Sequence, residues 1–135
     1  MSNFKQLRED LSPICVLYVE DEEKIRDETL KFLKKIFSCV DSAINGEEGL
    51  KLFKEKEYRL VIADLKMPKM NGREMLSKIR ELNENTVSIV MSASDSNIDM
   101  TTTVCDAYMN KPVEFMEFIK TLESLRNKLL SNPSQ

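Results

Sequence analysis

The sequence predicts an α/β fold: a doubly wound, five-stranded parallel sheet with helices on both faces. Short apolar runs, typical of strands buried on both sides, alternate five times with longer segments whose apolar residues recur at helical spacing. The length of 135 residues suits one domain with one core, and the sequence shows no internal repeat or interdomain linker. Right-handed crossovers between parallel strands then distribute the helices over both faces of the sheet.

Residues 1–13 form an N-terminal extension before the predicted domain, which covers residues 14–130. Phe4, Leu7 and Leu11 lie at helical spacing, which favours a short amphipathic helix within the extension. A Ser-Pro pair follows and ends it.

Apolar runs and capping residues define the elements of the first half. Residues 14–19 and 40–44 are predicted strands. Between them, residues 22–37 show helical spacing, with acidic residues at the start that favour a helix N-terminus. Asn45 is a predicted N-cap for the next helix, and Glu48 follows three residues later, close to the capping-box pattern.

The second half opens with residues 60–64, an apolar run that ends on a carboxylate, Asp64. The later elements are, in order, a helix over 73–82, a strand over 86–91, the segment 96–104, a strand over 107–109, a helix over 113–130 and a polar tail over 131–135. The segment 96–104 should cross back over the sheet, but three consecutive threonines give it poor helix propensity and no glycine ends it. We therefore expect a short or irregular fourth helix.

Composition excludes several classes of protein and site. Hydrophobic residues make up 41% and charged residues 32% of the chain, as in globular proteins. The net charge of -3 gives no reason to expect direct nucleic-acid binding, and no apolar run suits a membrane span or a signal peptide. Histidine is absent, which excludes Ser-His and Cys-His nucleophile pairs and histidine-liganded zinc. Any catalytic or binding chemistry must therefore use carboxylates, hydroxyls, lysines or backbone groups.

The three cysteines, Cys15, Cys39 and Cys105, are odd in number and lack the spacing of a metal site. Cys15 and Cys39 fall in or beside predicted strands, where a free thiol acts as a small buried hydrophobe. We therefore expect free thiols rather than a disulfide, and a reducing, cytoplasmic setting.

Polar residues gather where the predicted strands end. All strands of a parallel sheet end at one edge, so this edge collects Glu20, Asp21, Asp64, Ser92 and Lys111. Neighbouring carboxylates repel one another and raise each other's pKa values. A hard divalent cation relieves that repulsion, and Mg²⁺ favours a few carboxylates plus water. The sequence therefore predicts a site for Mg²⁺ (or Mn²⁺) with Asp64 at its centre.

Four motifs stand at the predicted strand ends: Val19-Glu20-Asp21-Glu22, Asp64 with Met67-Pro68-Lys69-Met70-Asn71-Gly72, Ser92-Ala93 and Lys111-Pro112. By these motifs, residues 14–130 resemble a response-regulator receiver domain of two-component signalling. Each motif is weak alone, but together, in order and at strand ends, they are specific. The resemblance implies a flavodoxin-like, three-layer sandwich.

The resemblance implies that Asp64 is the nucleophile that accepts a phosphoryl group, giving an aspartyl-phosphate. Asp21 and Asp64 would ligate the metal directly, and Glu20 would act through a water. The backbone carbonyl of Lys66 would complete the protein ligands. Glu20 stands where the family more often has aspartate, and its side chain reaches slightly further.

The resemblance also assigns roles around the phosphoryl group. Lys111 would neutralise its oxygens, aimed by a cis peptide bond to Pro112. The Ser92 hydroxyl would hydrogen-bond the phosphoryl group, and Tyr108 matches the family's aromatic switch, which turns inward on activation. Plainer interpretations make Ser92 an ordinary strand-end hydroxyl and Tyr108 a half-buried strand tyrosine.

Two further positions flank the phosphoryl group in the family and often tune its lifetime. They are Lys66, two residues after Asp64, and Ser94, two residues after Ser92. Lys66 would pair with Glu20 or with a phosphoryl oxygen and slow the attack of water.

The function implied is a receiver that takes a phosphoryl group from the phosphohistidine of a sensor histidine kinase or phosphotransfer protein. It would switch conformation to control an output domain or protein, catalysing only its own phosphorylation and dephosphorylation. Expected partners include neither nucleic acid nor membrane. A second copy of the chain is a further candidate. In the family, the fourth helix, the fifth strand and the fifth helix form the usual output face, so the resemblance implies that a short or irregular fourth helix would weaken a dimer through that face.

Two alternatives stay open. A pseudo-receiver would use the same fold as a phosphorylation-independent interaction module, which the irregular fourth helix favours and the intact site residues oppose. A phosphohydrolase of the haloacid dehalogenase type would carry a second aspartate where this chain has Lys66.

Overall fold

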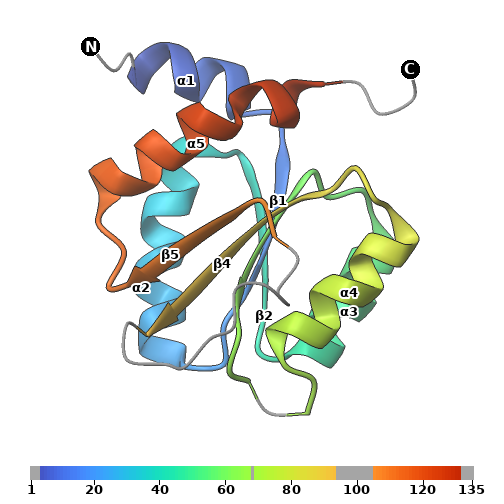
Figure 1. Ribbon diagram of the computed structural model, residues 1–135. Helices are drawn as coiled ribbons and strands as arrows, with labels where there is room; N and C mark the ends of the chain where they lie inside the picture. Colours follow the sequence, from blue (N-terminus) through green and yellow to red (C-terminus); the bar gives the residue numbers. More distant parts are fainter. Residues whose placement is uncertain (1–3, 68, 94–104, 132–135) are drawn as a thin grey trace.

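A five-stranded parallel sheet forms the centre of the molecule (Figure 1). The structure is a computed structural model that describes residues 4–67, 69–93 and 105–131. The strands lie in the order β2-β1-β3-β4-β5. Their bounds are β1 (Cys15–Val19), β2 (Cys39–Ala43), β3 (Leu60–Asp64), β4 (Val87–Ala93) and β5 (Ala107–Lys111). The predicted α/β class and parallel sheet are confirmed.

Helices cover both faces of the sheet, which gives three layers (Figure 1). Their bounds are α1 (Phe4–Leu11), α2 (Glu23–Ile36), α3 (Gly46–Glu55), α4 (Gly72–Leu82) and α5 (Phe115–Leu130). One core cluster joins the sheet to α1, α2 and α5, and a second joins it to α3 and α4. Tyr18 belongs to the first cluster and its neighbours Leu17 and Val19 to the second, as the two-residue period of a strand requires. None of the described helices has the length and apolarity that a membrane crossing needs.

The N-terminal extension forms the predicted helix and packs on α5. Leu7 and Leu11 are fully buried, and the Phe4 ring meets Phe115 edge-on with centroids 5.6 Å apart. Asp10 forms an ion pair with Arg126 of α5. Helix α1 is therefore part of the core on this face of the sheet.

Two strands run further than the apolar pattern predicted. β4 continues through Ser92 to Ala93, and β5 continues to Lys111. Ser92 pairs with Asn110 and Ala93 with Lys111. A ladder needs only backbone hydrogen bonds, so it continues where the side chains turn polar. The longer ends of β4 and β5 hold Lys111 on the sheet at its carboxyl edge.

The turns that lead into α3 and α4 fix the loops next to that edge. Asn45 Oδ1 accepts a hydrogen bond from the Glu48 amide at 2.8 Å, which confirms the predicted N-cap. Asn71 caps α4 in the same way, through the Glu74 amide. At Gly72, a Cβ atom would lie 2.2 Å from the Asp64 carbonyl oxygen, so only glycine lets α4 begin against the end of β3.

Cys15 and Cys39 form a disulfide, so the prediction of free thiols was wrong for this pair. They are the first residues of β1 and β2, which are adjacent strands, and the register places them opposite each other with Cα atoms 4.6 Å apart. The spacing of cysteines along the chain does not reveal this pairing, because strand order and register are tertiary properties. Cys105 is a free thiol and is half-buried.

The prediction of an irregular fourth helix over residues 96–104 concerns residues outside the described ranges. The same holds for Ser94 and for most of the expected C-terminal tail.

Candidate functional site

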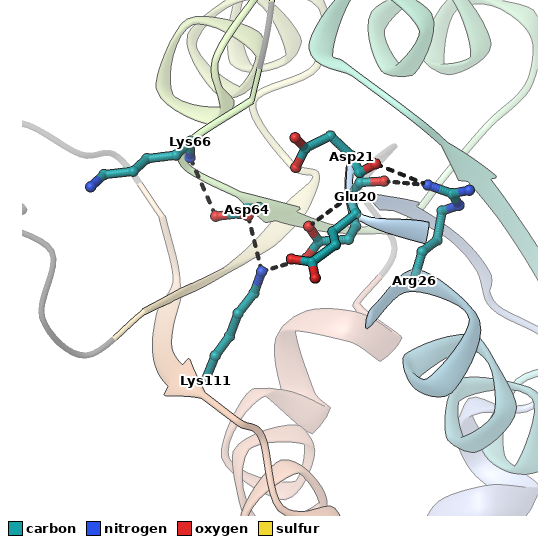
Figure 2. Close-up of polar contacts among 7 residues, drawn as sticks. Glu20, Asp21, Arg26, Asp64, Lys66 and Lys111 are labelled. Carbon is teal, nitrogen blue, oxygen red and sulfur yellow. Dashed lines mark hydrogen bonds and ion pairs between the residues drawn. The ribbon is translucent and has the colours of Figure 1, made fainter. Parts of the chain in front are cut away.

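The carboxyl edge of the sheet brings together charged side chains from three strands (Figure 2). Glu20 and Asp21 follow β1, Asp64 is the last residue of β3, and Lys111 is the last residue of β5. β3 lies between β1 and β4, so the Asp64 carboxylate is central among them. All five residues of β3 are buried, which anchors Asp64 on a rigid element.

The Lys111 ammonium bridges two of these carboxylates (Figure 2). Its Nζ lies 2.5 Å from Glu20 Oε1 and 2.9 Å from Asp64 Oδ2. Glu20 is 1% exposed and Asp64 is 9% exposed. Buried charges are stable only when paired and hydrogen-bonded, and Lys111 supplies both acids with a partner.

The pKa values of the bridged groups reflect their burial and their pairing. Burial raises the pKa of the Glu20 carboxyl and the Asp64 charge adds to this, while hydrogen bonding to Lys111 opposes it. Burial alone would lower the pKa of Lys111, but hydrogen bonds to Glu20 and Asp64 outweigh it and raise that pKa. Lys111 therefore stays protonated and is a fixed cation beside Asp64.

The three acids fit a divalent cation. Glu20, Asp21 and Asp64 each offer an oxygen, and these atoms lie within 4.8 Å of one another. Oxygen donors of this kind suit Mg²⁺, which also keeps several waters. Asp21 is exposed, so solvent reaches this side of the group.

Arg26, on the first turns of α2, holds the loop that carries two of the acids (Figure 2). Its Nη1 donates to the Glu20 carbonyl at 3.0 Å and points to the Asp21 carbonyl at 3.5 Å. Sequence analysis missed this residue. The available signal was an arginine five positions after Asp21, inside the predicted helix.

The family model for the response regulator receiver domain matches residues 16–123. The chain belongs to this family. The matched region contains Glu20, Asp21, Asp64 and Lys111, so the charged group described above lies inside the receiver domain.

Several curated proteins are similar to this receiver domain. It is 32% identical over 114 residues to the regulatory protein VanRB of Enterococcus faecalis, covering 83% of this chain and 52% of that protein. It is 34% identical over 104 residues to the uncharacterized transcriptional regulatory protein YcbL of Bacillus subtilis, covering 75% of this chain and 46% of that one. The chain thus spans about half the length of the curated relatives it matches.

Solved structures show the same fold. The response regulator TrrA of Thermotoga maritima, in complex with Mg²⁺ and BeF, is 31% identical with a TM-score of 0.73; the match covers 83% of this chain and 98% of that one. The chemotaxis protein CheY4 of Vibrio cholerae has a TM-score of 0.76 at 23% identity, covering 83% and 98%, and supports the fold alone.

Other residues singled out in the receiver sequence lie around this edge. Ser92 is 1% exposed near the end of β4. Tyr108, on β5, is half-buried and packs against the core cluster of α3 and α4. The Lys111–Pro112 peptide bond is cis, the isomer expected from the resemblance.

Lys66 reaches the site of this receiver through its backbone. Its amide lies 3.3 Å from Asp64 Oδ1 as a donor, while its side chain is directed away from the acids (Figure 2). Glu20 pairs with Lys111 instead, and the ion pairs found among the described residues do not include Lys66.

Proposed function

We propose that this receiver domain accepts a phosphoryl group on Asp64 in a reaction that requires Mg²⁺ or Mn²⁺. The observation that carries the proposal is the Lys111 ammonium 2.9 Å from Asp64 Oδ2, in a group whose three carboxylates lie close enough to share a cation. The donor is the phosphohistidine of a sensor kinase or phosphotransfer protein.

In the transfer step, an Asp64 carboxylate oxygen attacks phosphorus. The new O–P bond forms while the P–N bond to the donor imidazole breaks, and the electron pair of that bond stays on nitrogen. Lys111 remains protonated and shifts from the carboxylates toward the oxygens of the transferred group. Glu20, Asp21, Asp64 and the Lys66 carbonyl would hold the metal, which when bound neutralises the charge of carboxylates and phosphoryl oxygens.

A related solved structure supports this chemistry. TrrA, which is 31% identical to this chain, is in complex with Mg²⁺ and BeF. We propose that this chain also has a site that binds the metal and a phosphoryl-like group together.

The remaining roles are proposals of the same kind. Ser92 would hydrogen-bond the phosphoryl group, and Tyr108 would respond by turning inward. Lys66 and Ser94 would tune the lifetime of the phosphoryl group. Lys66→Ala should therefore change the hydrolysis half-life of the phosphoryl group, and an unchanged half-life would contradict this role of Lys66.

The output is proposed from the relatives. VanRB and YcbL are named as regulatory proteins, and the matched region is about half of each. We propose that this domain controls an output domain or partner protein through its conformation, without itself contacting nucleic acid or membrane. A homodimer of the domain is one arrangement through which it would do so.

The test is phosphorylation by acetyl phosphate with Mg²⁺, read as an acid-labile covalent phosphate by intact-protein mass. Asp64→Asn should abolish labelling, and Asp21→Asn should suppress it by weakening metal binding. Asp27→Asn makes the same chemical change at an exposed position of α2 and should label normally. Labelling that survives in Asp64→Asn overturns the assignment. No labelling of the wild type would favour the pseudo-receiver.

A further inference from the structure

The disulfide between Cys15 and Cys39 joins the first residues of β1 and β2 at the amino edge of the sheet. β2 is an edge strand and pairs with β1 along its whole length. Where this ladder ends, at the carboxyl edge, the Glu20 amide donates to the Ala43 carbonyl at 3.1 Å. The covalent bond and the backbone of one acid of the site therefore lie at the two ends of the same pair of strands.

Both cysteines are accessible to a small thiol. Cys15 and Cys39 are half-buried rather than enclosed in the core. Cys15 packs against the core cluster of α3 and α4, whereas Cys39 lies on the edge strand. Thiol–disulfide exchange requires access to a sulfur atom, so an incoming thiol meets Cys39 first.

The surroundings of the two cysteines allow the disulfide to open and close without a change of fold. Backbone pairing holds β1 on β2, and Ser38, next to Cys39, donates two hydrogen bonds to the Ser12 carbonyl. These contacts do not need the disulfide, so the two thiols stay opposite each other when it is reduced. The cytoplasmic, reducing setting that the sequence predicts keeps most cysteines as thiols, and disulfides that do form there usually sense redox state or take part in catalysis.

We propose that Cys15 and Cys39 form a reversible dithiol–disulfide couple that exchanges with glutathione and similar thiols. The oxidised couple holds β2 against β1 and, through the far end of the ladder, holds the Glu20 backbone in place. When the couple is reduced, the edge strand opens more often, and each opening removes the acceptor of the Glu20 amide. The domain thus has an input separate from phosphoryl transfer. Only the consequence of a looser Glu20 for metal binding rests on the proposed function.

Oxidation by glutathione disulfide takes two steps. The Cys39 thiolate attacks one sulfur of glutathione disulfide, which forms a mixed disulfide and releases one glutathione thiolate. The Cys15 thiolate then attacks the Cys39 sulfur, which closes the bond between the two cysteines and releases the second glutathione. The cysteine pair loses two electrons and two protons, and glutathione disulfide takes up both to give two glutathione molecules. Reduction is the reverse.

The first measurement equilibrates the native full chain in buffers that range from glutathione alone to glutathione disulfide alone. Acid quenching, alkylation of free thiols and peptide mass spectrometry then give the state of each cysteine. Cys15 and Cys39 should change together from two thiols to one disulfide as glutathione disulfide increases, and should return to thiols when the ratio is reversed. Cys105→Ser should show the same transition, because Cys105 is a free thiol outside the pair.

The second measurement is the hydrogen exchange of the Glu20 amide, in EDTA so that no metal holds the acids. Reduction should speed this exchange about tenfold, because the ladder between β1 and β2 then opens locally. The Asp106 amide donates to the Ser88 carbonyl on the other side of the sheet and is the internal control, whose exchange should not change. The double variant Cys15→Ser, Cys39→Ser should exchange like the reduced wild type in every buffer.

Three results would overturn the proposal. One is a pair of thiols that stays reduced at every ratio of glutathione to its disulfide. Another is a disulfide that excess dithiothreitol reduces only after the protein unfolds, which would make it a purely structural bond. The third is an equal rate of Glu20 exchange in the oxidised and the reduced wild type. This last comparison uses the wild type alone, so it decides the matter even if the double variant fails to fold.

Discussion

Lys111 is the residue on which the electrostatics of the site depend. It bridges Glu20 and Asp64, which are both largely buried. Because Mg²⁺ would neutralise the same carboxylates, the ammonium and the metal would have overlapping electrostatic roles. The free energy of unfolding, measured with and without Mg²⁺, tests whether these roles overlap.

Lys111→Met should lower the free energy of unfolding by about 3 kcal/mol in EDTA, since it leaves two buried carboxylates without their cation. Saturating Mg²⁺ should restore more stability to this variant than it adds to the wild type. Urea unfolding with EDTA and with Mg²⁺ measures both quantities. Lys120→Met, at an exposed position of α5, is the control. An equal response to Mg²⁺ in Lys111→Met and the wild type would contradict this account of the acidic group.

Arg26 acts on the same site through the backbone carbonyl of Glu20, to which its side chain donates a hydrogen bond. Arg26→Gln should lower the affinity for Mg²⁺ about tenfold, as changes behind metal ligands typically do. Calorimetric titration with Mg²⁺ measures this. Lys24→Gln, two residues away and exposed, should bind Mg²⁺ as the wild type does. If both variants bind equally well, Arg26 does not position the acids.

Among elements, β2 is tied to the segment before β3 by a side-chain hydrogen bond. The Tyr58 hydroxyl donates to Asp41 Oδ2 at 2.6 Å, and Lys56 forms an ion pair with the same oxygen at 2.8 Å. Hydrogen bonds from Lys56 and then Tyr58 lower the pKa of Asp41 below its ordinary value. A carboxyl whose pKa is lower in the folded state stabilises the protein above its unfolded pKa, and that stability is lost as pH falls through the folded pKa.

Tyr58→Phe should therefore lower the free energy of unfolding by about 1 kcal/mol at neutral pH, a modest value because Asp41 is partly exposed. The loss should shrink as the pH falls below the ordinary pKa of an aspartate carboxyl and through the lower pKa of Asp41 in the folded state, where Asp41 takes up a proton. Unfolding of the wild type, Tyr58→Phe, Asp41→Asn and the double variant at two pH values measures the coupling. A loss that does not change with pH would contradict the role of the Asp41 charge.

Local sequence patterns correctly predicted those features of the elements that depend only on neighbouring residues. The apolar run of β3 and the capping residue Asn45 are examples, because buried strands and N-caps depend on neighbouring residues. The ends of β4 and β5 were predicted too early, because the ladder continues past the last apolar side chain to Ala93 and Lys111. Those ends are set by the partner strand, which local sequence does not show.

At the scale of the whole molecule, parallel topology alone was enough to bring Glu20, Asp21, Asp64 and Lys111 to one edge. What it could not supply was the contacts within that edge, such as the bridge made by Lys111 or the hydrogen bond from Arg26 to the backbone. The disulfide escaped prediction for a related reason, since it depends on which strands are neighbours and in which register.

The disulfide closes a loop whose ends are 24 residues apart in the chain. Replacing Cys15 and Cys39 by Ala should lower the free energy of unfolding by about 3 kcal/mol, mainly by releasing the unfolded chain. Dithiothreitol should destabilise the wild type and Cys105→Ala by a similar amount and leave the double variant unchanged. Denaturant unfolding measures this; a double variant as stable as the oxidised wild type would contradict it.

The central claim is that Asp64, of all the acids at this edge, accepts the phosphoryl group. Borohydride reduces an aspartyl-phosphate to homoserine, which marks the modified residue. After treatment with acetyl phosphate and Mg²⁺, reduction and digestion, tandem mass spectrometry should find homoserine at position 64 and at no other acid. Homoserine at position 21, the corresponding reduced glutamate (2-amino-5-hydroxypentanoic acid) at position 20, or the absence of homoserine from a protein that carries covalent phosphate would contradict the claim.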